Sequence, residues 1–258
     1  EELKNAITDK TILVSIMFAN NEIGTIQPIS EIGEIAQKHK ITFHTDAVQA
    51  VGAIPIDTQK LNVDLLSMSA HKFYGPKGVG ALYIRKGVLP QNFLLGGAQE
   101  RHRRAGTENV AGIVGMAAAL KLACDNMDEH IEKMKSMRDY LIDQILEKIP
   151  HTRLNGDREK RLPTNANFSF EFIEGEALLL HLDLAGICAS SGSACTSGSL
   201  DPSHVLLSIG LPHEIAHGSL RLTLGDDNTK EQIDYVVKEL VRIVGLLRNM
   251  SPLYHGEM

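Results

Sequence analysis

Residues 63–72 read VDLLSMSAHK, and this stretch decides the fold class. The first seven residues, 63–69, are predicted to form a short buried β-strand. A His-Lys pair follows this segment at once, and the turn sequence GPKG at 75–78 leads into a further predicted strand at 79–85. A lysine directly after a buried strand can face a cleft and act as a nucleophile or form a Schiff base, so Lys72 is a candidate catalytic residue. A surface lysine before a turn is the alternative interpretation.

Two more strands are predicted upstream of this stretch, at 11–19 (TILVSIMFA) and at 41–46 (ITFHTD). The first is apolar and β-branch-rich, as for a strand buried on both faces. Between them, residues 29–38 have helical spacing, and Ser30 is the predicted N-cap. Strands that alternate with helices predict an α/β domain with a mostly parallel sheet, in which ligands bind beyond the carboxyl ends of the strands.

The second half of the chain has a different pattern, which predicts a smaller α+β domain. We place the boundary so that residues 1–125 form the first domain and 126–258 the second. Helices are predicted at 109–123, 128–149, 174–184 and 229–250, and strands at 165–172, 187–189 and 219–224. The apolar helix at 109–123 is expected to be buried, and Thr229 is the expected N-cap of the last helix.

Composition excludes several classes of protein. The chain has 258 residues and a formal net charge of −6, which argues against nucleic-acid binding and against a polybasic membrane anchor. No apolar run is long enough to span a bilayer. The three cysteines are an odd number at uneven spacing, which suits a reducing, cytoplasmic compartment better than a disulfide framework.

Asp46 ends the predicted strand 41–46, and Gln49 follows it by one turn. A cofactor of the pyridoxal type needs an acid at its pyridinium nitrogen to act as an electron sink. An Asp at one strand end and Lys72 at another supply the two groups that such a cofactor requires. Asp46 as a simple helix N-cap is the alternative.

Cys195 lies in a long Ser- and Gly-rich stretch, SSGSACTSGS at 190–199. These surroundings predict an exposed thiol that can enter a site and leave it again. Cys124 and Cys188 have apolar neighbours, so both are predicted to be core residues.

Arg221 is a single arginine inside the apolar strand 219–224, where it needs a partner. Its planar guanidinium group can form two parallel hydrogen bonds to a substrate carboxylate. The alternative interpretation is that Arg221 forms a structural salt bridge. The basic segment 100–109, which contains Thr107, is either a phosphate-binding helix start or a solvated loop. Residues 213–217 (HEIAH) match the zincin pattern, but Pro212 and Gly218 leave too little helix for it, so no metal site is predicted there.

Five spaced motifs resemble those of the pyridoxal-phosphate (PLP) dependent cysteine desulfurases, a class V aminotransferase family, and they stand in the right order along the whole chain. The motifs are 19–24 (ANNEIG), 44–49 (HTDAVQ), 69–72 (SAHK) with 74–78 (YGPKG), 104–107 (RAGT) and 191–195 (SGSAC). The resemblance implies a type I PLP-dependent transferase fold: a large PLP-binding domain and a smaller C-terminal domain that carries the catalytic cysteine. It also implies a homodimer.

The resemblance also implies a role for each candidate residue. Lys72 would form the Schiff base with PLP, and Cys195 would accept the sulfur. The implied cofactor-binding residues are Asn21, Asp46 at the pyridinium nitrogen, Gln49 at the ring hydroxyl, Ser69 and His71 at the phosphate, and Thr107 reaching across from the partner subunit. Asn21 and Arg221 would hold the substrate carboxylate.

The implied reaction converts L-cysteine to L-alanine and leaves a persulfide on Cys195. The sulfur would pass to an iron–sulfur scaffold or another acceptor protein, and Cys195 would contact an iron–sulfur cluster only on such a partner. A selenocysteine lyase, an aminotransferase of the same fold and a truncated, inactive scaffold are the alternatives.

The chain departs from the family pattern at its beginning, because family members start about a third of a chain earlier. That segment carries a small-residue turn onto the phosphate and a histidine that stacks on the PLP ring. We therefore expect an incomplete large domain that binds PLP weakly or not at all when the chain is alone.

Overall fold

The computed structural model describes residues 1–192 and 202–255, which form two compact units. The first unit consists of Glu1–Ala19 and Gln27–Met127. The second consists of Asn20–Ile26 and Asp128–Met258. The predicted first domain, 1–125, therefore includes a seven-residue segment, Asn20–Ile26, that packs with the second unit instead.

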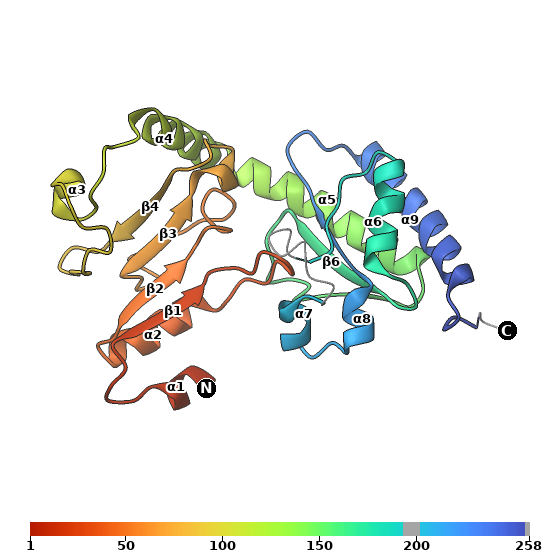
Figure 1. The fold of residues 1–258 in the computed structure, drawn as a ribbon, viewed down its shortest axis with the longest axis horizontal. Helices are drawn as coiled ribbons and strands as arrows, with labels where there is room; N and C mark the ends of the chain where they lie inside the picture. Colours follow the sequence, from red (N-terminus) through yellow and green to blue (C-terminus); the bar gives the residue numbers. More distant parts are fainter. Residues whose placement is uncertain (193–201, 256–258) are drawn as a thin grey trace. The chain divides into compact units, whose positions relative to one another are not determined.

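The first unit is built on a four-stranded sheet in the order β1-β2-β3-β4 (Figure 1). The strands are β1 (Leu13–Met17), β2 (Thr42–Asp46), β3 (Leu65–Ser69) and β4 (Gly80–Ile84). β1, β2 and β3 are parallel, and β4 runs antiparallel to β3. The prediction of a mostly parallel sheet is confirmed, and the carboxyl ends of three neighbouring strands meet at one edge.

The two faces of this sheet differ in burial. Val14, Phe43 and Leu66 are buried on the face that packs against α2 (Ile29–Lys38). On the opposite face, Leu13 and Met17 are 48% and 44% exposed. The expectation that the first strand is buried on both faces is therefore wrong, because its side chains alternate between a covered face and an uncovered one.

The α2 helix covers the residues predicted for it, but its N-terminus is capped differently. The residue at the N-cap position is Pro28, and no side chain caps the helix. The prediction of Ser30 as the cap is wrong, since Ile29 is already helical and Ser30 lies inside the first turn.

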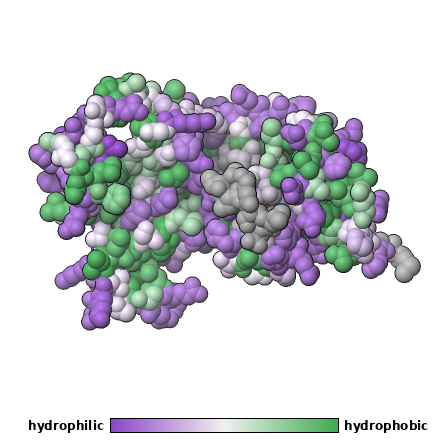
Figure 2. Space-filling model, viewed as in Figure 1, coloured by the Kyte–Doolittle hydropathy of each residue, from purple (hydrophilic) through white to green (hydrophobic). Residues whose placement is uncertain are grey.

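The other helices of the first unit are α1 (Glu2–Ala6), the 3₁₀ turn η1 (Ala70–Phe73), α3 (Gln99–His102) and α4 (Val110–Asp125). α4 was expected to be buried, yet Val110, Val114 and Leu122 are 67%, 63% and 64% exposed. Figure 2 shows this hydrophobic surface where Figure 1 places α4. An all-round apolar composition predicts burial, whereas in this unit only the side of α4 that carries Met116 is covered.

The second unit has a three-stranded antiparallel sheet in the order β5-β6-β7. Its strands are β5 (Thr152–Leu154), β6 (Asn165–Phe170) and β7 (Ser219–Thr223). Its helices are α5 (Met127–Lys148), α6 (Gly175–Leu184), α7 (His204–Ser208), α8 (His213–His217) and α9 (Lys230–Met250). The short strand predicted at 187–189 does not form; instead Ser190 makes an isolated bridge with Arg221.

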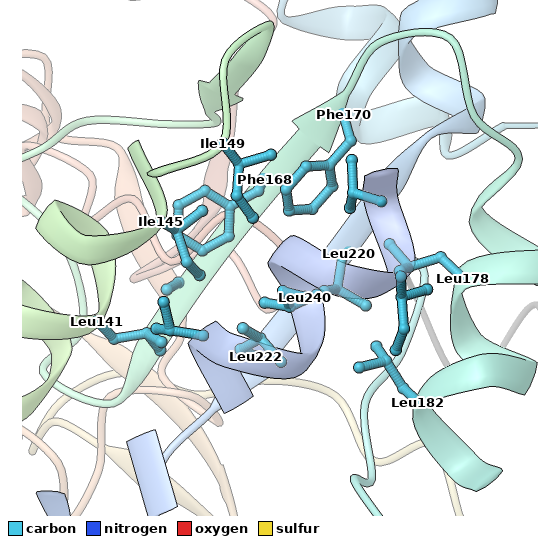
Figure 3. Packing of buried hydrophobic residues seen from close by; sticks show 14 of the residues in the cluster. Leu141, Ile145, Ile149, Phe168, Phe170, Leu178, Leu182, Leu220, Leu222 and Leu240 are labelled. Atoms are coloured by element: carbon cyan, nitrogen blue, oxygen red, sulfur yellow. The ribbon is translucent and has the colours of Figure 1, made fainter. Parts of the chain in front are cut away.

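The core of the second unit lies between this sheet and its long helices, and Figure 3 shows its side chains converging. Phe168, Phe170, Leu178, Leu220 and Leu240 are fully buried there. All six residues of β6 are buried, although Asn165, Asn167 and Ser169 are polar and alternate with the apolar ones. One face of β6 therefore supplies the core, and the other buries a row of polar groups.

The last helix begins where the sequence predicted. Thr229 accepts a hydrogen bond from the backbone N–H of Gln232, whose side chain accepts one from the N–H of Thr229. This reciprocal pair is a capping box, which stabilises the first turn of α9.

Within residues 1–192 and 202–255, no single helix is both long enough and apolar enough to cross a membrane. α4 and α5 satisfy the length and composition criteria only when they are taken together.

Candidate active site

The first unit brings four of the predicted site residues to one edge of its sheet. Asp46 ends β2, Ser69 ends β3, and His71 and Lys72 follow in η1. The strand register pairs Asp46 with Ser67, so Ser69 lies two residues further along the neighbouring strand. A carboxylate, a hydroxyl, an imidazole and an ammonium group therefore gather beyond the carboxyl ends of adjacent parallel strands, where α/β sheets bind ligands.

A tight turn fixes the direction of His71 and Lys72. Ala70 is fully buried, and its carbonyl accepts a hydrogen bond from the N–H of Gly75 at 2.9 Å. A Cβ on Gly75 would lie 2.9 Å from that carbonyl oxygen, so the turn needs glycine there. Tyr74 adopts the left-handed conformation with φ 62°, which turns the chain back toward β4. His71 and Lys72 are left exposed at the edge of the sheet.

Hydrogen bonds order the polar groups at this edge. The Ser69 hydroxyl lies 2.8 Å from Nδ1 of His71. One oxygen of Asp46 accepts the backbone N–H of Val48 at 3.0 Å. Gln49 follows in the same turn and is half-buried.

A row of polar side chains that was not predicted from the sequence lies beside Asp46. His44 contacts Ser15 on β1 through Nδ1 at 2.7 Å and Ser67 on β3 through Nε2 at 2.8 Å. Burial lowers the pKa of His44, and the negative charge of Asp46 opposes this shift. The row ties three neighbouring strands together on the face that carries Asp46. Its sequence signal is polar residues at alternate positions of strands that pair in register.

Thr107 lies in the exposed segment between α3 and α4. Among the residues that the structure describes, no hydrogen bond joins Thr107 to the group at the sheet edge. Its predicted role in phosphate binding across a subunit interface stays a prediction.

The second unit brings together Asn21 and Arg221, the two residues predicted to hold a substrate carboxylate. Nη1 of Arg221 donates to the backbone carbonyl of Asn21 at 3.1 Å. The backbone of Arg221 also pairs with Ser190 in both directions. Arg221 is half-buried on β7, and within residues 1–192 and 202–255 its guanidinium group makes only the hydrogen bond to Asn21.

The polar face of β6 holds the loop that carries Asn21. The side-chain amides of Asn165 and Asn167 both donate to the backbone carbonyl of Glu22 at 3.1 Å. Buried Arg161 donates to the carbonyl of Ile23 at 2.9 Å, and its burial lowers the pKa of Arg161 to about 10. The sequence pattern at 165–172 predicts only a strand and does not indicate that Asn165 and Asn167 position this loop.

The cysteines differ from their predicted environments. Cys124 and Cys188 are both exposed, so the prediction that they are core residues is wrong. Cys124 lies on the uncovered part of α4, and Cys188 lies in the loop after α6, where neighbouring sequence does not decide burial. Cys195 lies outside the described residues.

The HEIAH segment forms the five-residue helix α8, in which the rings of His213 and His217 make an edge contact at 4.7 Å. In the described part of the chain, no group of three or more His, Cys, Asp or Glu side chains could hold a metal ion.

The groups at the sheet edge fit PLP chemically. A lysine amine suits its aldehyde, and a carboxylate on the neighbouring strand suits its pyridinium nitrogen. The adjacent Ser69 hydroxyl and His71 imidazole are hydrogen-bond partners for its phosphate.

The fold is that of a type I PLP-dependent transferase. The Aminotransferase class-V family matches residues 1–236, and the chain belongs to that family, whose cofactor is PLP. The chain is 63% identical to the cysteine desulfurase IscS of Clostridium botulinum over all of its own length and 66% of that relative's. It is 62% identical to the IscS of Methanosarcina thermophila over 98% of its own length and 62% of that relative's.

Solved structures agree with this assignment. A NifS-like protein aligns with a TM-score of 0.86 at 40% identity, over 95% of this chain and 64% of its own. SspA in complex with cysteine aligns with a TM-score of 0.70 at 34% identity, over 86% of this chain and 61% of its own. The chain thus spans about two thirds or less of the length of each of these proteins.

Proposed function

We propose that this chain serves a PLP-dependent cysteine desulfurase, which converts L-cysteine to L-alanine and transfers the sulfur to Cys195. The observation that carries the proposal is the gathering of Asp46 with Ser69, His71 and Lys72 at the ends of adjacent strands. The similarity to curated cysteine desulfurases over the whole of this chain supports the choice of reaction.

The residues of the first unit bind the cofactor and move a proton. When bound, PLP supplies the electron sink that makes the Cα proton of an amino acid removable. Asp46 would keep a proton on the ring nitrogen, while Ser69 and His71 would hold the phosphate. The amine of Lys72 would take the Cα proton of the substrate and return a proton to the product.

The residues of the second unit bind the substrate and receive its sulfur. Arg221, held against the carbonyl of Asn21, pairs with the carboxylate of L-cysteine. The Cys195 thiolate attacks the substrate sulfur, so the carbon–sulfur bond breaks and a sulfur–sulfur bond forms. The substrate carbon gains a proton, alanine leaves, and no external oxidant or reductant is needed.

The wider setting belongs to the same proposal. We expect a homodimer in which Thr107 reaches the partner's cofactor, a cytoplasmic location, and an iron–sulfur scaffold or another protein as sulfur acceptor. The odd number of cysteines supports a cytoplasmic location, and the exposure of Thr107 supports its role across a subunit interface. Sedimentation or light scattering of the purified protein tests the dimer directly.

The decisive experiment uses purified protein of the relatives' full length, records its absorbance spectrum with PLP before and after addition of L-cysteine, and then assays persulfide by cyanolysis. A visible band that shifts with cysteine, and persulfide that vanishes in Cys195→Ala, is the expected result. A shifting band without persulfide, accompanied by keto-acid formation, would favour an aminotransferase. A strong preference for selenocysteine over cysteine would favour a selenocysteine lyase.

A further experiment tests the 258-residue chain by itself, because the relatives are longer than this chain. We expect the 258-residue chain alone to hold PLP weakly, because it spans only 66% of the Clostridium botulinum relative. Stoichiometric PLP in the isolated chain would contradict this expectation. The absence of any band in protein that carries the complete family length would favour the inactive-scaffold alternative.

A further inference from the structure

Glu22 is a buried carboxylate to which the proposed chemistry gives no role. Only 1% of the residue is exposed. A buried carboxylate is costly unless hydrogen-bond donors satisfy it. The hydroxyl of Ser203 donates to Oε2 of Glu22, and Gly192 packs against the same oxygen, since a Cβ built there would lie 3.2 Å from it.

The backbone of Glu22 is fixed independently of these contacts. Its N–H donates to the side chain of Asn20 at 2.8 Å. Its carbonyl accepts from the side chains of Asn165 and Asn167 on β6. The next residue, Ile23, lies in a small apolar cluster with Leu206. The backbone of Glu22 is thus held in place by hydrogen bonds, and its carboxylate contacts Ser203 and Gly192.

Gly192 and Ser203 are also tied to ordered elements of the second unit. Gly192 follows Ser190, which pairs with the backbone of Arg221. Ser203 caps α7 by accepting the N–H of Val205 at 3.1 Å. In the sequence these two residues stand on either side of 193–201, the segment that contains Cys195.

We propose that Glu22 is a positioning residue whose buried carboxylate fixes both ends of the Cys195 segment beside the Asn21–Arg221 pair. This inference rests on the proposed desulfurase function, because that function makes Cys195 the sulfur acceptor. The same loop thereby orients the substrate through Asn21 and the sulfur acceptor through Glu22.

The test compares Glu22→Gln, Glu22→Ala and Ser203→Ala with an exposed control on α5, Glu132→Gln. Proteinase K cleavage between residues 190 and 203 is followed by mass spectrometry in the 258-residue chain. Cleavage should accelerate about tenfold or more in Glu22→Ala, because a hydrogen bond to a charged group is lost. Glu22→Gln keeps an acceptor for Ser203 and should fall between Glu22→Ala and the wild type, and the control should match the wild type.

A second readout uses PLP-loaded protein of the complete family length. Persulfide formation should slow about tenfold or more in Glu22→Ala, with partial rescue in Glu22→Gln, while the spectral shift on addition of cysteine is kept. If the wild type itself forms no persulfide, the desulfurase proposal fails, and the cleavage assay still tests Glu22.

Cleavage and persulfide rates equal to those of the wild type in both Glu22 variants would overturn the inference. A lower unfolding temperature with unchanged cleavage between 190 and 203 would also overturn it, because Glu22 would then be merely structural. If Glu22→Ala does not fold, Ser203→Ala carries the test, since it removes the same hydrogen bond and leaves the 20–26 loop intact. Ser203→Ala also removes the cap of α7, so its cleavage rate is compared with that of Glu22→Gln, which keeps the cap.

Discussion

Replacing Asn167 by alanine should destabilise the second unit by removing two hydrogen bonds at once. The side-chain amide of Asn167 donates to the carbonyl of Glu22 at 3.1 Å. Its carbonyl oxygen accepts from Asn155 at 2.8 Å. The residue is fully buried, so water cannot take over either bond in the folded state.

The size of the destabilisation depends on which hydrogen bonds Glu22 and Asn155 retain in the variant. Glu22 retains its hydrogen bond from Asn165, and Asn155 retains one to Ser169 at 2.9 Å, so neither partner is left wholly unsatisfied. The loss of two hydrogen bonds between uncharged groups, at about 1 kcal/mol each, and the small cavity left by the side chain lower the free energy of unfolding by about 2–3 kcal/mol. For a domain of this size the loss corresponds to a fall of roughly 8–12 °C in unfolding temperature.

Urea and thermal unfolding, followed by circular dichroism, measure this loss of stability. The control variant is Asn249→Ala, which changes an exposed asparagine on α9 and should alter the free energy of unfolding by less than about 0.5 kcal/mol. The double variant Asn165→Ala/Asn167→Ala should lose more than the sum of the single variants, because the Glu22 carbonyl then has neither amide donor. An Asn167→Ala protein as stable as the Asn249→Ala control would refute the argument that β6 holds the 20–26 loop.

Three further predictions concern single side chains. Lys72→Ala should abolish the PLP absorbance band and reduce turnover by about 10²- to 10⁴-fold, as measured by alanine formation. Because burial lowers the pKa of His44 below its usual 6.5, the unfolded chain binds more protons at acid pH. The stability that this shift contributes is therefore present above about pH 6.5 and is lost as the pH falls further, and His44→Gln should flatten that pH dependence in urea titrations. Thr229→Ala should cost about 1 kcal/mol in thermal unfolding, because it breaks the capping box with Gln232.

The sheet of the first unit and the group at its edge could be predicted from sequence because their signals are local. A β-branch-rich segment that ends on Asp46, and a second predicted strand that ends just before His71 and Lys72, mark strand ends directly. Parallel pairing then places these ends at one edge without further information. The capping box at Thr229 is equally local, and it too was predicted.

Burial could not be predicted in the same way, because it depends on partners far away in the sequence. α4 is apolar all round, yet Val114 is exposed because only one side of the helix is covered. Cys124 lies on that helix and Cys188 follows α6, and both have apolar neighbours although both are exposed. Hydropathy describes the residue and its neighbours, whereas exposure is set by the fold.

The strand β6 shows how some of this non-local information can still be recovered from sequence. Its residues NANFSF alternate amide or hydroxyl with apolar side chains, the usual pattern of a strand with one solvated face. Here both faces are buried, so Asn165 and Asn167 need hydrogen-bond partners, and the backbone of the 20–26 loop supplies them. Two asparagines on one face of a strand, rather than charged residues, are suited to such a role because an amide can be buried at far lower cost than a charge. The polar face of β6 is therefore the physical reason that residues 20–26 pack with the second unit although the chain on either side of them belongs to the first.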